Sequence, residues 1–311
     1  MKFHFTQLNS TYSIVARDPQ TGQFGVAVQT HQMSVGNGVP WLLPGVGAIA
    51  TQSLTNVSFG PTGLRMLREG ISASHVIRAL VASDDGENRR QVAVVDSSGR
   101  AAAHTGKGCI AEAGHHVGDG YSVQANMMTR ATVVQAMAIA YETTQGDLAQ
   151  RMLAALEAAQ VEDGDIRGMQ SSALVVVPGD LNTPEWKKDY SLRVDEHENP
   201  IMELARLVRH RRAQLIDEQG SALLETGEHH EALKRWAEAR ALAPEQEELA
   251  FWQGVTLADK TGDIEAAVAI LKPMLAVDPR RDEWIELIRR LANCGLIERE
   301  GVDADLIRAL G

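Results

Sequence analysis

Runs of apolar and β-branched residues predict strands in the first half of the chain. Thr11–Arg17 and Phe24–Thr30 are two such runs, and the segment between them contains Pro19 and Gly22, which favour a hairpin. Further strands are expected, in chain order, at Val46–Gln52, Gln91–Val95, Arg100–Thr105, Tyr121–Gln124 and Ser171–Val177.

Helical patterns lie between these strands. Pro61–Glu69 has a Pro near its start, and Ser72–Ala82 begins with a residue type suited to a helix N-cap. Thr132–Thr143 and Asp147–Gln160 form a second helix pair. The order of strands, two helices, strands, two helices and a strand favours an α+β fold, which we expect to be a four-layer αββα sandwich over residues 1–190.

The pattern changes after residue 190, where glycines become rare and Ala, Leu, Glu and Arg become dense. We expect a linking helix region at 191–215 and an all-α domain at 216–311. Thr226-Gly227 recurs as Thr261-Gly262, and Pro244 recurs as Pro279, with an offset of 35 residues. Since tetratricopeptide repeats have a period of about 34 residues, the spacing predicts tetratricopeptide-like helix pairs.

Charge and targeting signals narrow the function classes. The chain has 41 acidic against 30 basic residues and a net charge of −11, which disfavours nucleic acid and anionic membranes as partners. The first ten residues lack the apolar region of a signal peptide, and no segment has the roughly 20 apolar residues of a membrane span. The two cysteines, Cys109 and Cys294, fit a reducing compartment. We therefore expect a cytoplasmic protein.

Short motifs in the first 212 residues carry a family resemblance. They are Thr11–Pro19, Gly25–Val28, Val35-Gly36, Pro40-Trp41, Gly45–Ala48, Ala50–Gln52, Asn56, Gly60-Pro61, Ala103–Gly106, Gly114-His115, Gly118–Gly120, Gln124, Asn126-Met127, Asp165, Arg167-Gly168, Gln170-Ser171 and Leu192–His197. In that order they resemble the domain of unknown function numbered one-zero-two-eight, a family with a fold like that of N-terminal-nucleophile (Ntn) hydrolases. The resemblance covers roughly Thr11 to Arg212.

The resemblance implies chemistry at Thr11. In Ntn hydrolases the nucleophile is the first residue of the mature chain, and its own α-amine is the general base. Family members begin almost at this Thr, whereas ten residues precede Thr11 here. With Ser10 attached the amine is an amide and cannot accept a proton. The chain is therefore either cut before Thr11 or does not use this mechanism.

Two functions remain open at this point. The preferred one is an Ntn-type amidohydrolase that acts on a small amide or peptide-like substrate. The alternative is a non-catalytic ligand-binding or assembly module whose helical repeats recruit a protein partner.

The resemblance and the strand pattern select the candidate site residues. The catalytic candidates are Thr11 as nucleophile, Ser13 on the same strand face, and His31 at the position where such hydrolases place a basic residue. Each also has a plain structural reading as part of a strand or its end. The candidate substrate-binding residues are Asn56, His104, His115, Gln124, Asn126 and Arg167. The amides of Gln124 and Asn126 suit an oxyanion, and Arg167 suits a carboxylate or a brace with Asp165.

Other chemistries have weaker support. Cys109 with a histidine could transfer acyl groups, and His104, His115, His116 and Asp119 could gather a metal, but neither spacing is a known signature. No P-loop, dinucleotide-binding or serine-hydrolase motif occurs. We therefore expect no metal and no cofactor. The apolar stripe Ile201, Leu204, Leu207 and Val208 on the linking helix must be covered either by the first domain or by a second subunit. We expect a homodimer, because it is the commonest oligomer.

Overall fold

The computed structural model describes residues 8–9 and 11–311. The chain forms two compact units, residues 1–208 and residues 209–311, and the boundary lies inside the long helix α5 (Pro200–Glu225). The boundary falls within the predicted linking region, and we describe the two units separately.

The first unit contains two antiparallel sheets. Sheet A has the order β1 (Leu8–Asn9), β5 (Gly47–Leu54), β6 (Arg90–Asp96) and β7 (Ala101–Thr105), and β4 (Pro40–Leu43) also pairs with β5. Sheet B has the order β11 (Tyr190–Val194), β10 (Ser171–Val177), β3 (Phe24–Thr30), β2 (Thr11–Arg17), β9 (Tyr121–Asn126) and β8 (Gly114–Gly118). The first unit is therefore a mixed α/β fold built on two antiparallel sheets.

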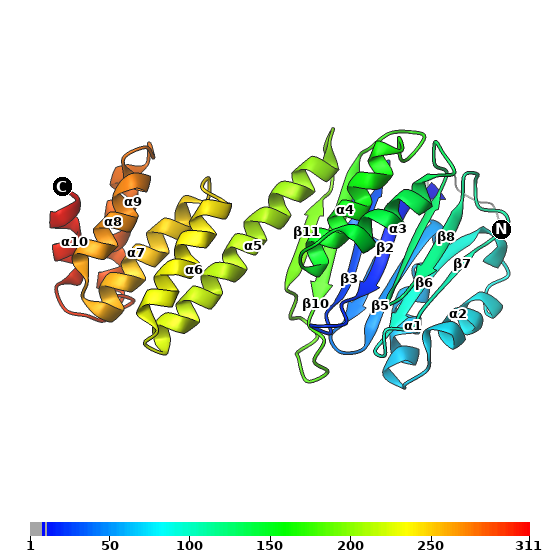
Figure 1. The fold of residues 1–311 in the computed structure, drawn as a ribbon, viewed down its shortest axis with the longest axis horizontal. Coiled ribbons are helices and arrows are strands. Elements are labelled where there is room, and N and C mark those ends of the chain that lie inside the picture. The colour runs from blue at the N-terminus through cyan, green and yellow to red at the C-terminus, as the bar shows by residue number, and fades with distance from the viewer. Residues whose placement is uncertain (1–7, 10) are drawn as a thin grey trace. The chain divides into compact units, whose positions relative to one another are not determined.

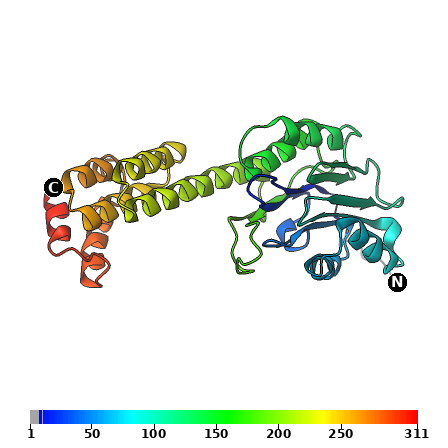
Figure 2. The ribbon, with the colours of Figure 1, turned by 60° about the horizontal axis from the view of Figure 1, so that its bottom comes forward.

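The two sheets face each other, and two helices cover the outer face of each (Figures 1 and 2). Helices α1 (Phe59–Arg68) and α2 (Ala73–Ala82) pack on sheet A, while α3 (Val133–Thr143) and α4 (Leu148–Val161) pack on sheet B. Alternate residues of each strand point to opposite faces. One set of side chains therefore fills the space between the sheets, and the other set meets the helices.

The sequence pattern located most of these elements. The predicted strands at Thr11–Arg17, Phe24–Thr30 and Ser171–Val177 have the bounds of β2, β3 and β10, and the four predicted helices match α1 to α4 within two residues at each end. Strands β1, β4, β8 and β11 were not predicted. They are short, and β4 and β8 contain the Pro and Gly residues that mask a strand pattern.

The second unit is all helical. After the last turns of α5 it contains α6 (His229–Leu242), α7 (Glu247–Thr261), α8 (Ile264–Leu275), α9 (Arg281–Asn293) and α10 (Val302–Leu310). Trp236 and Trp284 are buried in its core. Among the described helices of the whole chain, none combines the length and the apolar character needed to cross a membrane.

The linking-helix stripe does not need a second subunit to cover it. Ile201, Leu204 and Val208 are each 5% exposed or less within the single chain. Leu207, the fourth residue of the stripe, is partly exposed. Most of the stripe is therefore buried within the single chain, and the homodimer stays a prediction.

Candidate functional site

A buried polar network occupies one end of the space between the two sheets. The remainder of this space is filled by apolar side chains such as Val15, Val26 and Val95. At the end where β2 begins, the side chains that point inward are instead polar and are each at most 1% exposed: Thr11, Ser13, Thr30, Gln52, Gln91, Ser122, Gln124, Asn126 and Ser171. Burying so many polar groups is costly unless they are hydrogen-bonded.

Thr11 lies at the head of β2 and is fully buried. Its neighbours across the ladder are Thr30 on β3 and Asn126 on β9. The Thr11 Oγ1 lies 3.5 Å from the Thr30 Oγ1, and the Thr11 carbonyl accepts from Gln52 Nε2 at 3.2 Å and Asn126 Nδ2 at 3.4 Å. These side-chain partners are all neutral.

Ser13 reaches the same amide groups from the next inward position of β2. Its Oγ donates to Gln52 Oε1 and accepts from Gln124 Nε2, both at 2.5 Å. Ser122 Oγ in turn donates to Gln124 Oε1 at 3.0 Å. Ser13 is therefore connected to Thr11 through Gln52, and the structure brings together the candidates Thr11, Ser13, Gln124 and Asn126.

Gln91 on β6 is the centre of the network and was not singled out from the sequence. Its Oε1 accepts from Gln52 Nε2 at 2.6 Å and from Asn126 Nδ2 at 2.9 Å, while its Nε2 donates to Thr105 Oγ1 at 2.9 Å. Gln52 and Gln91 had one visible signal in the alternation of their strands. Gln52 follows the alternate residues Ala48 and Ala50, and Gln91 precedes the alternate residues Ala93 and Val95.

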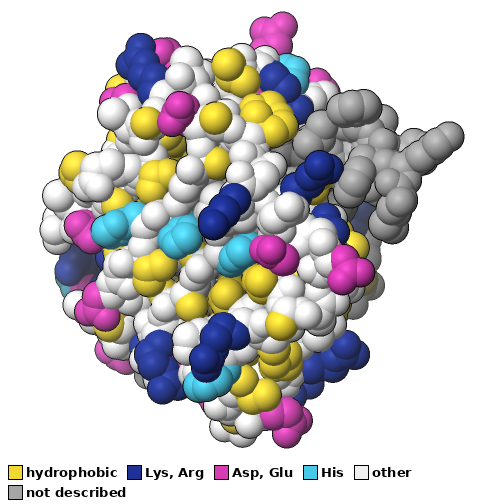
Figure 3. Space-filling view, turned by 90° about the vertical axis from the view of Figure 1, so that its right-hand side faces the viewer, with side chains coloured by type: hydrophobic (Ala, Val, Ile, Leu, Met, Phe, Trp, Pro, Cys, Tyr) yellow, Lys and Arg dark blue, Asp and Glu magenta, His cyan; other side chains and the backbone are white. Residues whose placement is uncertain are grey.

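Thr105 connects the buried network to His115 at the surface of the first unit. Its Oγ1 lies 2.8 Å from His115 Nδ1. Desolvation lowers the pKa of His115, and the nearby His104 and His116 lower it further, which favours the neutral form of the ring. Figure 3 shows a face of the molecule on which several histidine side chains lie close to both acidic and basic side chains.

A surface pocket of about 520 Å³ lies beside His115 and is lined by the loop that joins β7 and β8. The loop is fixed where the Met127 N–H donates to the Ile110 carbonyl at 3.0 Å. Cys109 lies in this loop, and burial raises the pKa of its thiol, which disfavours the thiolate that a nucleophile needs.

Within the described residues, no three His, Cys, Asp or Glu side chains gather closely enough to hold a metal ion.

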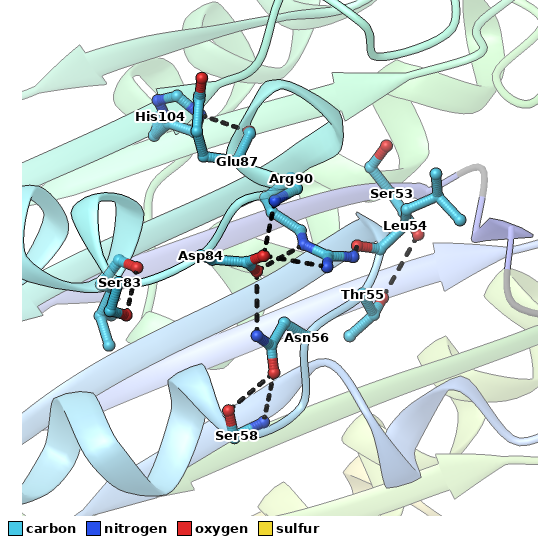
Figure 4. Close-up of polar contacts among 12 residues, drawn as sticks. Ser53, Leu54, Thr55, Asn56, Ser58, Ser83, Asp84, Glu87, Arg90 and His104 are labelled. Carbon is cyan, nitrogen blue, oxygen red and sulfur yellow. Dashed lines mark hydrogen bonds and ion pairs between the residues drawn. The ribbon is translucent and has the colours of Figure 1, made fainter. Parts of the chain in front are cut away.

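Asn56 and His104 belong to a different group, which fixes the end of β5 and the start of β6 (Figure 4). Arg90 Nε donates to Asp84 at 2.8 Å, Asn56 Nδ2 donates to Asp84 at 3.0 Å, and the Arg90 guanidinium also donates to the Leu54 carbonyl. The hydrogen bond from Arg90 is the main reason that the pKa of Asp84 falls to about 2. His104 Nε2 lies 3.0 Å from the Glu87 carbonyl.

His31 and Arg167 form a third group around a buried carboxylate. Asp165 accepts from the His31 backbone N–H at 3.0 Å and from Arg167 Nη2 at 3.0 Å. The His31 ring lies against the Met169 carbonyl, with Nδ1 at 3.2 Å from the oxygen. The Asp165–Arg167 pair therefore braces a loop, and the His31 ring is not among the hydrogen-bond partners of Thr11.

The family model described as a family of unknown function, DUF1028, matches residues 11–204. The chain belongs to this family. The match begins at Thr11, the first residue of β2, and ends in the first turns of α5, so the second unit lies outside the DUF1028 region.

A solved structure supports the same assignment. The chain is 31% identical to protein SPO2555 from Silicibacter pomeroyi, which is also described as DUF1028. The TM-score is 0.58, and the similarity covers 64% of this chain and 88% of that one. No curated protein matches the sequence. The chain therefore shares both the family and the fold of the DUF1028 region with protein SPO2555.

Proposed function

We propose that the protein is an Ntn-type amidohydrolase whose nucleophile is Thr11, exposed as the first residue by cleavage of the Ser10–Thr11 bond. The observation that carries the proposal is the setting of Thr11, which begins a central strand of sheet B. The side chains that hydrogen-bond to its hydroxyl (Thr30) and to its carbonyl (Gln52 and Asn126) are neutral. A free α-amine on Thr11 would supply the base that this setting lacks.

The reaction follows from these groups. The Thr11 amine takes the proton of Oγ1 as the oxygen attacks the amide carbonyl, and the departing amine then receives that proton. The resulting ester on Thr11 reacts with water to give the acid and the free hydroxyl. Asn126 and Gln52 hold the Thr11 carbonyl, so they fix the direction of the nucleophile, and Ser13 holds Gln52.

The finer fold assignment is part of the same proposal. Two sheets with a helix pair on each outer face have the layer order of the Ntn-hydrolase sandwich. In the second unit, a Cβ added at Gly220 would lie 2.4 Å from Trp236, and one added at Gly254 would lie 2.5 Å from Leu271. These two close contacts are spaced almost one repeat apart, which supports tetratricopeptide-like helix pairs.

One observation favours the alternative of a non-catalytic binding or assembly module. The Thr11 side chain is 0% exposed in the uncut chain, so no substrate can reach it before cleavage. In this alternative the helical repeats of the second unit recruit a protein partner.

Variants at Thr11 test the enzyme proposal. Thr11→Ala should abolish hydrolysis of peptide amides and lower the free energy of unfolding by only about 1 kcal/mol, whereas Thr11→Ser should keep part of the activity because a hydroxyl remains. The matched control is Thr51→Val, which removes another buried hydroxyl, one bonded to the Gly38 carbonyl at 2.7 Å, and should leave hydrolysis unchanged. Full activity of Thr11→Ala would end the proposal.

A further inference from the structure

We infer that the substrate of this site is a peptide whose acyl side binds as an extra strand on sheet A, along the edge of β5 at Ser53 and Leu54. The inference rests on the proposed function, because it names the substrate class of the same site. The occupant of that edge in the uncut chain is the chain's own strand β1.

The edge of β5 is shared between two short strands. β6 pairs with β5 from Gly47 to Ser53 on one side, and β4 pairs with it from Gly47 to Ala50 on the other. β1 continues on the side of β4, where Leu8 lies opposite Leu54 and Asn9 lies opposite Ser53 in antiparallel register. Removing residues 1–10 would leave this part of the edge open, and an open edge can accept an extended peptide through main-chain hydrogen bonds.

The open edge would lie next to the nucleophile. Gln52, which precedes Ser53, donates to the Thr11 carbonyl at 3.2 Å. Along the chain only Ser10 separates β1 in sheet A from β2 in sheet B. Leu8 and Asn9, on the acyl side of the Ser10–Thr11 bond, are already paired with β5, and the acyl side of an external amide would take the same place.

The end of β5 is held rigidly in the shape that pairs with β1. Ser53 has a positive φ of 66°, a conformation that is rare for a residue with a Cβ and that often marks a functional site. The Arg90 guanidinium donates to the Leu54 carbonyl and to Asp84, and Asn56 donates to the same Asp84 carboxylate (Figure 4). An edge that is ordered before binding loses less entropy when a peptide pairs with it.

The register sets the length of the recognised segment. Asn9 and Leu8 are the second and third residues before the Ser10–Thr11 bond, so an acyl side of at least three residues is needed to form the pairs with Ser53 and Leu54. An amide with a single acyl residue would reach Thr11 without them.

Fluorogenic amides test this on the processed full chain. Acetyl-Gln-Leu-Asn-Ser-aminomethylcoumarin, which follows residues 7–10, should have a kcat/KM at least about tenfold higher than acetyl-Ser-aminomethylcoumarin. In an antiparallel pair, only one of two consecutive N–H groups points to the partner strand. N-methylation of one of these two residues, the Leu or the Asn, should therefore remove that gain in kcat/KM, whereas N-methylation of the other should not.

The outcomes separate the two proposals. Equal kcat/KM for the long and short amides, or equal effects of the two methylations, would overturn the strand-addition inference while leaving the hydrolase in place. If the chain is never cut and never hydrolyses an amide, the proposed function fails. Hydrogen exchange in Leu8→Pro and Asn9→Pro then tests separately whether the edge of β5 at Ser53 and Leu54 binds an extended strand. Faster exchange at Ser53 or Leu54 in one of these two variants, with Leu8→Ala as control, would support the edge, and no change in either would overturn it.

Discussion

The two ends of the space between the sheets differ sharply although the same strands form both. At one end β2, β3, β5 and β6 contribute Val15, Val26, Ala48 and Val95. At the other end the same four strands contribute Thr11, Thr30, Gln52 and Gln91, all at most 1% exposed. The apolar end is a conventional core that stabilises the fold through burial.

The polar end has no such role in stability. A buried polar network contributes little net free energy even when it is fully bonded, and an apolar layer of the same shape would serve folding equally well. Polar residues at the same end of these four strands therefore indicate a site, and Thr11 lies in it. The contrast predicts that changes at the apolar end affect stability, whereas changes at the polar end affect chemistry.

The largest effect on stability is expected at the apolar end. Phe24→Ala removes a ring that is 1% exposed in the apolar cluster and should lower the free energy of unfolding by about 3–5 kcal/mol, because a cavity remains. Urea denaturation measures this, and cleavage before Thr11 should be unaffected in the fraction that is folded. A smaller loss than that of the polar-end variants below would break the contrast.

A smaller effect is expected from the ion pair that holds the end of β5. Asp84→Asn should lower the free energy of unfolding at pH 7 by roughly 2 kcal/mol, the equivalent of the fall in the pKa of Asp84 from 3.8 to about 2. Since the folded-state pKa is the lower one, this stabilisation is complete above about pH 4 and is lost as the pH falls toward 2. Unfolding measured at pH 7 and at pH 2 should therefore show a gap between the variant and the wild type that closes in acid. A gap of the same size at both pH values would contradict this.

A loss of stability similar to that of Asp84→Asn, together with a loss of activity, is expected within the polar network. Gln91→Leu leaves the donors of Gln52 and Asn126 without the acceptor that they share and should cost about 1–3 kcal/mol. It should also slow amide hydrolysis, because both amides hold the Thr11 carbonyl. Ser122→Ala is the matched control, since Ser122 bonds only to Gln124 in this network, and it should leave the rate nearly unchanged. Equal rates for the two variants would argue against a role for the network in positioning Thr11.

The sequence predicted the strands of this site better than the site itself. The run of apolar and β-branched residues at Thr11–Arg17 located β2 with its observed bounds, because strand propensity is a property of the local sequence. The convergence of Thr11, Gln52 and Gln91 depends on the register and facing of strands far apart in the chain, which local pattern does not contain. His31 and Arg167 were predicted as site residues, but both donate hydrogen bonds to Asp165 and so belong to a separate group.

The family resemblance added what the local pattern did not. The run Thr11–Pro19 predicted Thr11 as the nucleophile through this resemblance, and the family match begins at the same residue. Strand β1 could not be predicted from two residues of sequence, since its identity as a strand comes only from its pairing with β5.

The central claim is that Thr11 becomes the first residue of the working protein. Intact-mass spectrometry of the purified wild-type chain, paired with an amide-hydrolysis assay on the same sample, tests it most directly. The account predicts a chain that begins at Thr11 in the active wild type and a chain that keeps its first residues in Thr11→Ala. A sample that hydrolyses amides while its chain still begins at Met1 or Lys2 would contradict the account.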